Sequence, residues 1–126
     1  MGISRSFWMR KPRTRNEGTM TEAAFFGTIR SALRELSFRG KLGKPRQEAT
    51  RRARISRGMY RCSECGEATP HKDIEVDHIH PCGPLQTFHD LEGFCRRLFC
   101  DADGLRVVCK RCHHNKTFNR ACGENS

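Results

Sequence analysis

Apolar residues recur at helical intervals in the first third of the chain, between residues 21 and 37. They are Phe25, Phe26, Ile29, Leu33 and Leu36. This period predicts an amphipathic helix whose apolar stripe packs against a core. Thr19 and Glu22 have the spacing of a capping box at its start. Two glycines and a proline within residues 37–45 predict that the helix ends there.

A second helix is expected to begin near Pro45, which suits a first helical position, and to include residues 46–57. This segment has few apolar residues to bury, so we expect it to lie at the edge of the core. Its arginines would then face solvent or a nucleic-acid backbone. The candidate phosphate contacts are Arg51, Arg52 and Arg54. Contacts of this kind supply an affinity that falls with salt and do not read base sequence.

Short apolar runs, turns and cysteines replace this pattern from Tyr60 onward. Residues 74–76 alternate as a short strand does, and residues 105–108 are expected to form a second strand. Between them, the apolar face of a short helix consists of Phe88, Leu91, Phe94, Cys95 and Leu98. Thr87 is its candidate N-cap. A last helix is expected to follow the final Cys-x2-Cys pair and to end near Arg120.

The charge of the chain is unevenly distributed. The net charge is +10, and residues 1–61 hold 16 of the 24 basic residues but only 4 of the 14 acidic ones. This asymmetry indicates a polyanionic partner, most simply nucleic acid, although charge does not distinguish DNA from RNA. A solubilising surface is the alternative. Residues 1–18 show no apolar period and are expected to form a flexible basic arm along phosphates, or an unstructured tail.

Composition indicates a small domain that needs a staple. The chain has 126 residues, of which 36% are hydrophobic, and its mean hydropathy is −0.74, so the core must be thin. The first 15 residues lack the apolar run of a signal peptide, and no stretch approaches the ~20 apolar residues of a membrane span. We therefore expect a cytoplasmic protein with no membrane association. In that compartment, paired cysteines indicate zinc rather than disulfides.

Two Cys-x2-Cys pairs provide the expected staple. The thiolates of Cys62, Cys65, Cys109 and Cys112 would complete a closed, tetrahedral, structural zinc site. The two pairs are separated by 43 residues. Lengthening a closed loop from about 17 residues to this length costs only ~0.8 kcal/mol. Structural zinc supplies on the order of 10–16 kcal/mol, so the site is expected to form.

The other four cysteines have no partner at two-residue spacing. They are Cys82, Cys95, Cys100 and Cys122. We expect them to be small buried hydrophobes, with the exchange of one zinc ligand for Cys122 or His114 as the alternative. His71 and His89 are expected on the surface.

Zinc at the four paired cysteines would organise the segments between them. Residues 74–78 and 105–108 would become antiparallel partners, and the helix after Cys112 would be tethered beside them. His113, in the first turn of that helix, would then lie near the end of the first strand.

The segments CSEC, VDHIHP and GLRVVCKRCHHNKT, within residues 60–119, resemble the HNH nucleases, the ββα-metal group, and especially its small phage-encoded members. This resemblance implies an α+β fold with a small zinc-stapled ββα-metal core, preceded here by basic helices. It also implies that Asp77 and His113 bind a divalent ion and that His78 is the general base.

Two features complicate the resemblance. The family's asparagine, five residues before the third cysteine, is replaced by Gly104, and Asp103 is the candidate to take over its loop-holding hydrogen bonds. In addition, neighbouring side chains on a regular strand point to opposite faces, so Asp77 and His78 can serve one site only if the strand twists or ends there. Otherwise His80, which shares a face with His78, is the rival base.

The chemistry of phosphodiester hydrolysis suits these residues. A neutral imidazole accepts the proton of a water molecule near pH 7, and one cation relieves charge at the phosphate and at the leaving oxygen. Two protein ligands leave positions for water and phosphate, as Mg²⁺ requires, and the histidine ligand also suits Mn²⁺, Co²⁺ or Ni²⁺. Lys116 and Arg120 share a helical face with His113, so they are candidate phosphate contacts or part of a solvated face.

The sequence therefore predicts a metal-dependent DNA endonuclease in three parts. These are a basic arm (residues 1–18), a helical DNA-contacting extension (19–59) and a zinc-bound nuclease domain (60–122). It would nick or cut DNA with one divalent ion, as a monomer or a homodimer, in the host cytoplasm if it is phage-encoded. The alternatives are a non-catalytic zinc-ribbon protein that binds nucleic acid, and an accessory protein of phage packaging or recombination.

Overall fold

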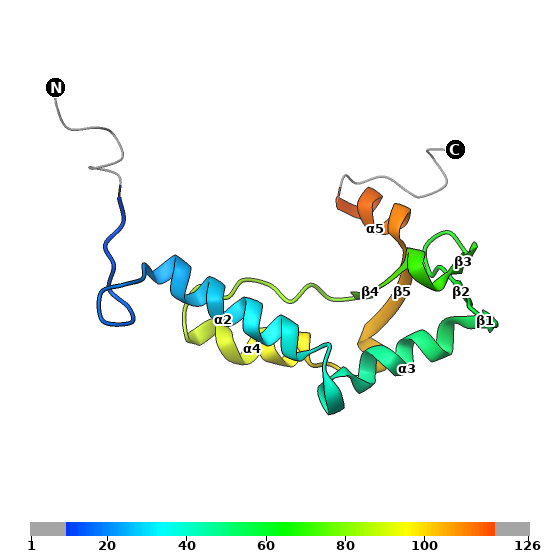
Figure 1. Cartoon of the computed structure of the whole chain (residues 1–126), viewed down its shortest axis with the longest axis horizontal. Helices are drawn as coiled ribbons and strands as arrows, with labels where there is room; N and C mark the ends of the chain where they lie inside the picture. Colours follow the sequence, from blue (N-terminus) through cyan, green and yellow to red (C-terminus); the bar gives the residue numbers. More distant parts are fainter. Residues whose placement is uncertain (1–9, 118–126) are drawn as a thin grey trace, which may run out of the picture.

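The structure is a computed structural model that describes residues 10–117 (Figure 1). Its helices are α2 (Glu22–Leu36), α3 (Lys44–Ala53), α4 (His89–Leu98) and α5 (Lys110–Thr117). Its strands are β1 (Arg54–Ser56), β2 (Met59–Arg61), β3 (Ala68–Pro70), β4 (Ile74–His78) and β5 (Leu105–Cys109). Short 3₁₀ turns span Gly40–Gly43, His71–Asp73 and Ala102–Gly104. The predicted mixture of helix and sheet is confirmed. Among these residues, no helix has both the length and the apolar character needed to cross a membrane.

Helix α2 confirms the first predicted helix. Its N-cap is Thr21, whose hydroxyl oxygen accepts a hydrogen bond from the backbone N–H of Ala24 at 3.1 Å. The predicted capping box is therefore wrong, because Thr19 lies outside the helix. The Glu22 carboxylate forms an ion pair with Arg15 instead. This ion pair ties the segment before the helix to its first turn.

Helix α3 ends earlier than the sequence pattern predicts. Pro45 lies in its first turn, as expected, but the helix stops at Ala53, and Arg54 begins strand β1. Gly58 has a φ of +74°, the left-handed conformation that suits the tight turn between β1 and β2. The result is a three-stranded antiparallel sheet in the order β1-β2-β3. The sequence does not reveal this sheet, because each strand has only three residues.

Strands β4 and β5 form a separate two-stranded antiparallel sheet, which confirms their predicted pairing. The register is regular, from Ile74 opposite Cys109 to His78 opposite Leu105. The strand ends at His78, which fits the expectation that it twists or ends at the Asp77-His78 step. The side chains of these two residues leave opposite faces of β4.

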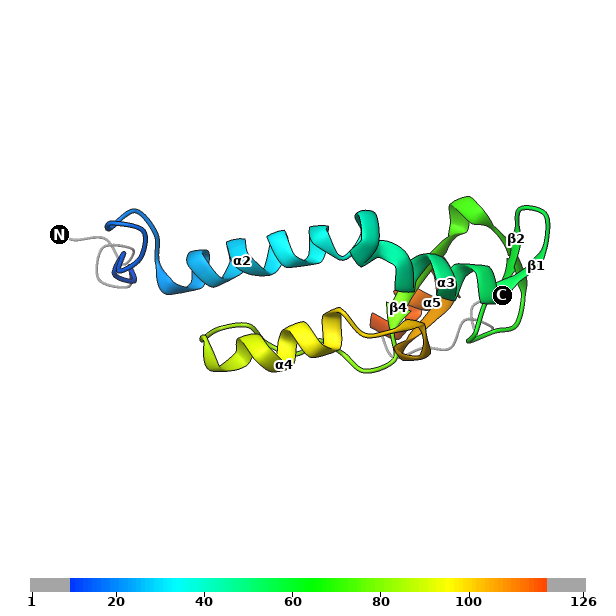
Figure 2. The ribbon, with the colours of Figure 1, turned by 90° about the horizontal axis from the view of Figure 1, so that it is seen from below.

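Three small clusters take the place of one large core. Helices α2 and α4 lie side by side and enclose the first cluster (Figure 1, Figure 2). Its buried residues are Phe26, Cys82, Leu85, Phe94 and Leu98. The second cluster, Ala49, Ala102 and Leu105, joins α3 to β5, and the third gathers paired cysteines around Val108. Leu36, the last residue of the predicted α2 stripe, is 42% exposed. The thin core that the composition predicts is thus also a divided one.

Candidate active site

Four cysteine sulfur atoms meet where β2, β5 and α5 converge. They belong to Cys62, Cys65, Cys109 and Cys112, and all lie within 4.8 Å of one another. A tetrahedral site with Zn–S bonds of about 2.3 Å needs sulfur pairs about 3.8 Å apart, so only a small contraction is required. The four predicted ligands are therefore positioned together to hold a metal ion, and their arrangement is compatible with structural zinc.

Backbone N–H groups point at these sulfur atoms. The N–H of Cys109 donates to Cys62 Sγ over 3.2 Å, and the N–H of Cys112 donates to Cys109 Sγ over 3.3 Å. Burial raises the pKa of the Cys62 thiol, but hydrogen bonds from the N–H groups of Cys65 and Cys109, among others, bring this pKa down to about 7. Gly66, with a φ of +76°, closes the first turn by donating to the Cys62 carbonyl at 2.9 Å. The thiolate form, which binds metal, is thereby favoured.

The remaining cysteines lie outside this cluster. Cys82 is buried against the α2–α4 cluster as predicted, whereas Cys95 and Cys100 are only partly buried. All three are free thiols. Cys122 lies outside the described residues. His114 is exposed and does not belong to the cysteine cluster.

A cavity of about 750 Å³ lies beside β4. All five residues of the strand line it, from both of its faces, so the cavity follows the edge of β4 that β5 leaves open. Asp77 and His78 therefore line one cavity even though they point to opposite faces of the strand. His113 lines it as well. From helices α2 and α3 the same cavity is lined by Arg30, Arg34 and Arg46.

His78 is held in one orientation. Only 9% of the residue is exposed, and its Nε2 lies 3.0 Å from the carbonyl oxygen of Leu98. A carbonyl oxygen can only accept, so Nε2 donates to it, and in the neutral tautomer that fits this contact the lone pair lies on Nδ1. Leu98 is the last residue of α4, so the helix inserted between β4 and β5 orients this imidazole. His80, the rival base, is exposed beyond the end of β4.

Asp77 and His113 each contact a further charged residue. Asp77 Oδ1 accepts a hydrogen bond from the His78 N–H at 2.9 Å, and Oδ2 lies 3.5 Å from Arg106 on β5. His113 Nδ1 lies 3.5 Å from Glu75 Oε2. Glu75 is not among the residues predicted for the site. The signal that could have identified it is its position two residues before Asp77, which places both side chains on the same face of the strand. Within residues 10–117, only the cysteines form a compact group of three or more metal-ligating side chains.

Backbone hydrogen bonds hold Gly104 in place. Its carbonyl accepts from the N–H of Ile79 at 2.9 Å, and its own N–H donates to the carbonyl of Asp101 at 2.9 Å. A Cβ added at Gly104 would lie 2.8 Å from Cys100 Sγ and 3.1 Å from Cys100 Cβ. The Cys100 side chain thus occupies the space that an asparagine would need, and main-chain bonds connect this turn to the residue after β4.

Replacing Gly104 with asparagine is expected to lower the free energy of unfolding by roughly 1–3 kcal/mol, because the new side chain overpacks against Cys100. Urea denaturation followed by circular dichroism measures this change. The double variant Cys100→Ala/Gly104→Asn removes the sulfur and should recover most of the loss, with Cys100→Ala alone as the matched control. Equal stability of Gly104→Asn and the wild type would contradict this explanation of the glycine.

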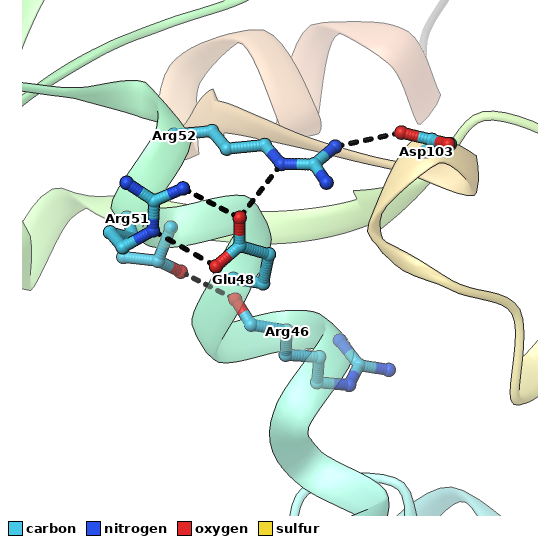
Figure 3. Close-up of polar contacts among 6 residues, drawn as sticks. Arg46, Glu48, Arg51, Arg52 and Asp103 are labelled. Atoms are coloured by element: carbon cyan, nitrogen blue, oxygen red, sulfur yellow. Dashed lines mark hydrogen bonds and ion pairs between the residues drawn. The ribbon is translucent and has the colours of Figure 1, made fainter.

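The arginines of α3 that were candidate phosphate contacts are engaged with carboxylates (Figure 3). Arg51 and Arg52 both donate to Glu48, at 2.7 Å and 3.0 Å in their ion pairs. Hydrogen bonds from Arg51, and then from Arg52, lower the pKa of Glu48 to about 2. Asp103 accepts from Arg52 at 2.7 Å, so it joins its turn to α3. Arg54 is exposed at the start of β1.

The other two candidate phosphate contacts are Lys116 and Arg120. The side chain of Lys116 and the whole of Arg120 lie outside the described residues. Of the arginines that line the cavity, Arg30 and Arg34 were not predicted for the site, whereas Arg46 belongs to the segment 46–57, whose arginines were expected to face solvent or a nucleic-acid backbone. The spacing of Arg30 and Arg34, four residues apart on one helix face, is the available signal, but nothing local connects it to β4.

Comparison with known proteins does not add to this geometry. No family model, no curated protein and no solved structure matches the chain. The function of this chain is therefore inferred from the cysteine cluster and from the cavity beside β4.

Proposed function

We propose that this protein is a metal-dependent DNA endonuclease of the HNH type. The supporting observation is the cavity beside β4, because His78 lines it in a defined tautomer together with the candidate metal ligands Asp77 and His113. The cysteine cluster, with zinc as its structural ion, joins β5 and α5 to the end of β2 and so maintains the distances within this cavity.

Each residue has a chemical role in the proposed reaction. His78 Nδ1 accepts the proton of the attacking water, while the Leu98 carbonyl keeps Nε2 protonated. Glu75 orients the His113 imidazole at Nδ1, which leaves Nε2 with the lone pair that a metal ligand needs. Asp77 and His113 would hold Mg²⁺ or Mn²⁺, with Co²⁺ or Ni²⁺ as substitutes. A divalent ion there supplies positive charge to the phosphate and to the leaving oxygen.

A second function, nucleic-acid binding without catalysis, is favoured by one observation. Arg106 lies 3.5 Å from Asp77 Oδ2, directly across the strand pair. An arginine at this distance competes with a divalent ion for the carboxylate. In this case the protein would be a zinc-ribbon binding module, and its basic N-terminal half would still attract DNA.

Plasmid cleavage distinguishes the two functions. Zinc-loaded protein is incubated with supercoiled plasmid and, in separate reactions, with Mg²⁺, Mn²⁺, Co²⁺ or Ni²⁺. We expect nicked or linear product that depends on the added ion. The binding function would be established instead by one result. The protein, with its zinc held by all four cysteine thiolates, would bind the plasmid but leave it intact with every ion.

A further inference from the structure

Two arginines of α2, Arg30 and Arg34, line the cavity together with the carboxylates of β4, which carry the opposite charge. Arg30 is held in place: its Nη1 donates to the Gly83 carbonyl at 3.0 Å, and its guanidinium lies 4.9 Å from the ring centroid of Phe94. Arg34 follows one helical turn later and is exposed. Arg30 therefore supports the wall of the cavity, whereas Arg34 presents its charge to whatever enters.

Arg46, on α3, is oriented by its neighbours. Its guanidinium lies 4.0 Å from the ring centroid of Phe38 and donates to the carbonyl of Val76, on β4, at 3.4 Å. Figure 3 shows its guanidinium directed away from the ion pairs of Glu48. Burial lowers the pKa of Arg46, and the nearby charge of Arg34 lowers it further. Two positive charges thus lie close enough to repel each other beside the strand that carries the candidate catalytic residues.

The positive charge of this cluster is not neutralised within the described part of the chain. No ion pair there includes Arg30, Arg34 or Arg46. The two carboxylates that line the cavity, Glu75 and Asp77, contact other cationic or titratable side chains. A partly buried charge without a counter-ion is unfavourable, so this cavity favours the binding of an anion.

We infer that Arg34 and Arg46 together bind a phosphate group of the DNA strand that enters the cavity, next to the phosphate at the proposed metal site. The identity of the strand rests on the proposed function, which this inference deepens. A guanidinium offers parallel N–H donors that match two phosphate oxygens. Arg46 is already oriented by Phe38 and Val76, so it loses little conformational freedom on binding. The arginines of α3 that pair with Glu48 would first have to exchange that carboxylate for the phosphate.

Fluorescence anisotropy of a labelled short DNA duplex tests the inference. Binding is measured without added divalent ion, so that the strand stays intact. Arg34→Gln and Arg46→Gln are each expected to weaken binding about tenfold, since hydrogen bonds to charged groups are strong. Each should also reduce the slope of log K against log salt by about 0.9, as the loss of one phosphate contact requires.

Arg96→Gln is the matched control. It removes the same charge from α4, where Arg96 is exposed, pairs with Glu92 at 3.0 Å and does not line the cavity. Zinc content and the melting temperature verify that each variant is folded. Arg34→Gln decides the outcome, because Arg34 is exposed and its replacement is expected to leave the protein folded.

The possible outcomes separate this inference from the proposed function. If Arg34→Gln binds DNA as tightly as Arg96→Gln while the wild type cleaves plasmid, the inference is overturned and the nuclease function stands. If the wild type cleaves nothing but Arg34→Gln still weakens binding, the phosphate site stands and the nuclease function fails. Equal binding by all variants, with no cleavage, rejects both.

Discussion

Replacement of His78 by glutamine is expected to reduce plasmid cleavage by roughly 10²–10⁴-fold, the usual contribution of a general base. The lone pair on Nδ1 is lost, so no side chain at this position can accept the proton of the attacking water. Glutamine is chosen because its amide N–H can still donate to the Leu98 carbonyl, which His78 contacts at 3.0 Å. The rate of conversion of supercoiled to nicked plasmid measures the effect, with Mg²⁺ or Mn²⁺ present.

The controls for this prediction come from the same chain. Zinc content and DNA affinity of His78→Gln should equal those of the wild type, because the change removes neither a cysteine ligand nor a positive charge. His80→Ala removes the rival base, which is exposed beyond β4, and should leave the rate unchanged. Full activity in His78→Gln, or loss of activity in His80→Ala, would contradict the assignment of His78 as the general base.

Replacement of Cys62 by serine is expected to abolish stoichiometric zinc binding and to unfold the domain around β4, β5 and α5. Cys62 is 1% exposed, and its sulfur accepts a hydrogen bond from the Cys109 N–H. A structural zinc supplies about 10–16 kcal/mol, comparable with or larger than the 5–15 kcal/mol by which domains of this size are usually stable. Among residues 10–117 there is no disulfide and no second group of three or more metal-ligating side chains to compensate for the loss.

Metal analysis and thermal denaturation measure the two effects of Cys62→Ser. Cys95→Ser is the matched control, since Cys95 is a partly buried free thiol outside the cluster. It should bind one zinc per chain and melt close to the wild type. A Cys62→Ser protein that is folded and contains a full equivalent of zinc would show that the ligand set is different.

The parts of the fold that follow from the sequence are those with local signals. The apolar period of residues 25–36 predicts α2, and the alternation of residues 74–76 and the short, mostly apolar run of residues 105–108 predict β4 and β5. The two Cys-x2-Cys turns predict the cysteine cluster, because four thiolates at that spacing satisfy one tetrahedral ion. Each of these signals involves residues only a few positions apart, although the two Cys-x2-Cys turns are themselves separated by 43 residues.

The three-stranded sheet after α3 shows where local signals end. Arginine is a good helix former, so the run from Arg51 to Arg57 continues the helical pattern past Ala53. Pairing with β2 overrides this preference at Arg54, which lies opposite Tyr60. Strands of three residues carry too little alternation to indicate that pairing in advance.

The sequence by itself determined which groups are available: four paired thiolates, an Asp-His step at the end of a strand, and a strongly basic N-terminal half. Only the tertiary structure decided how they meet. The Leu98 carbonyl orients His78 from 20 positions away, Arg46 reaches Val76 across 30 positions, and Arg30 reaches Gly83 across 53. No local pattern encodes such contacts, because they depend on how α2, α3 and α4 pack around one strand edge.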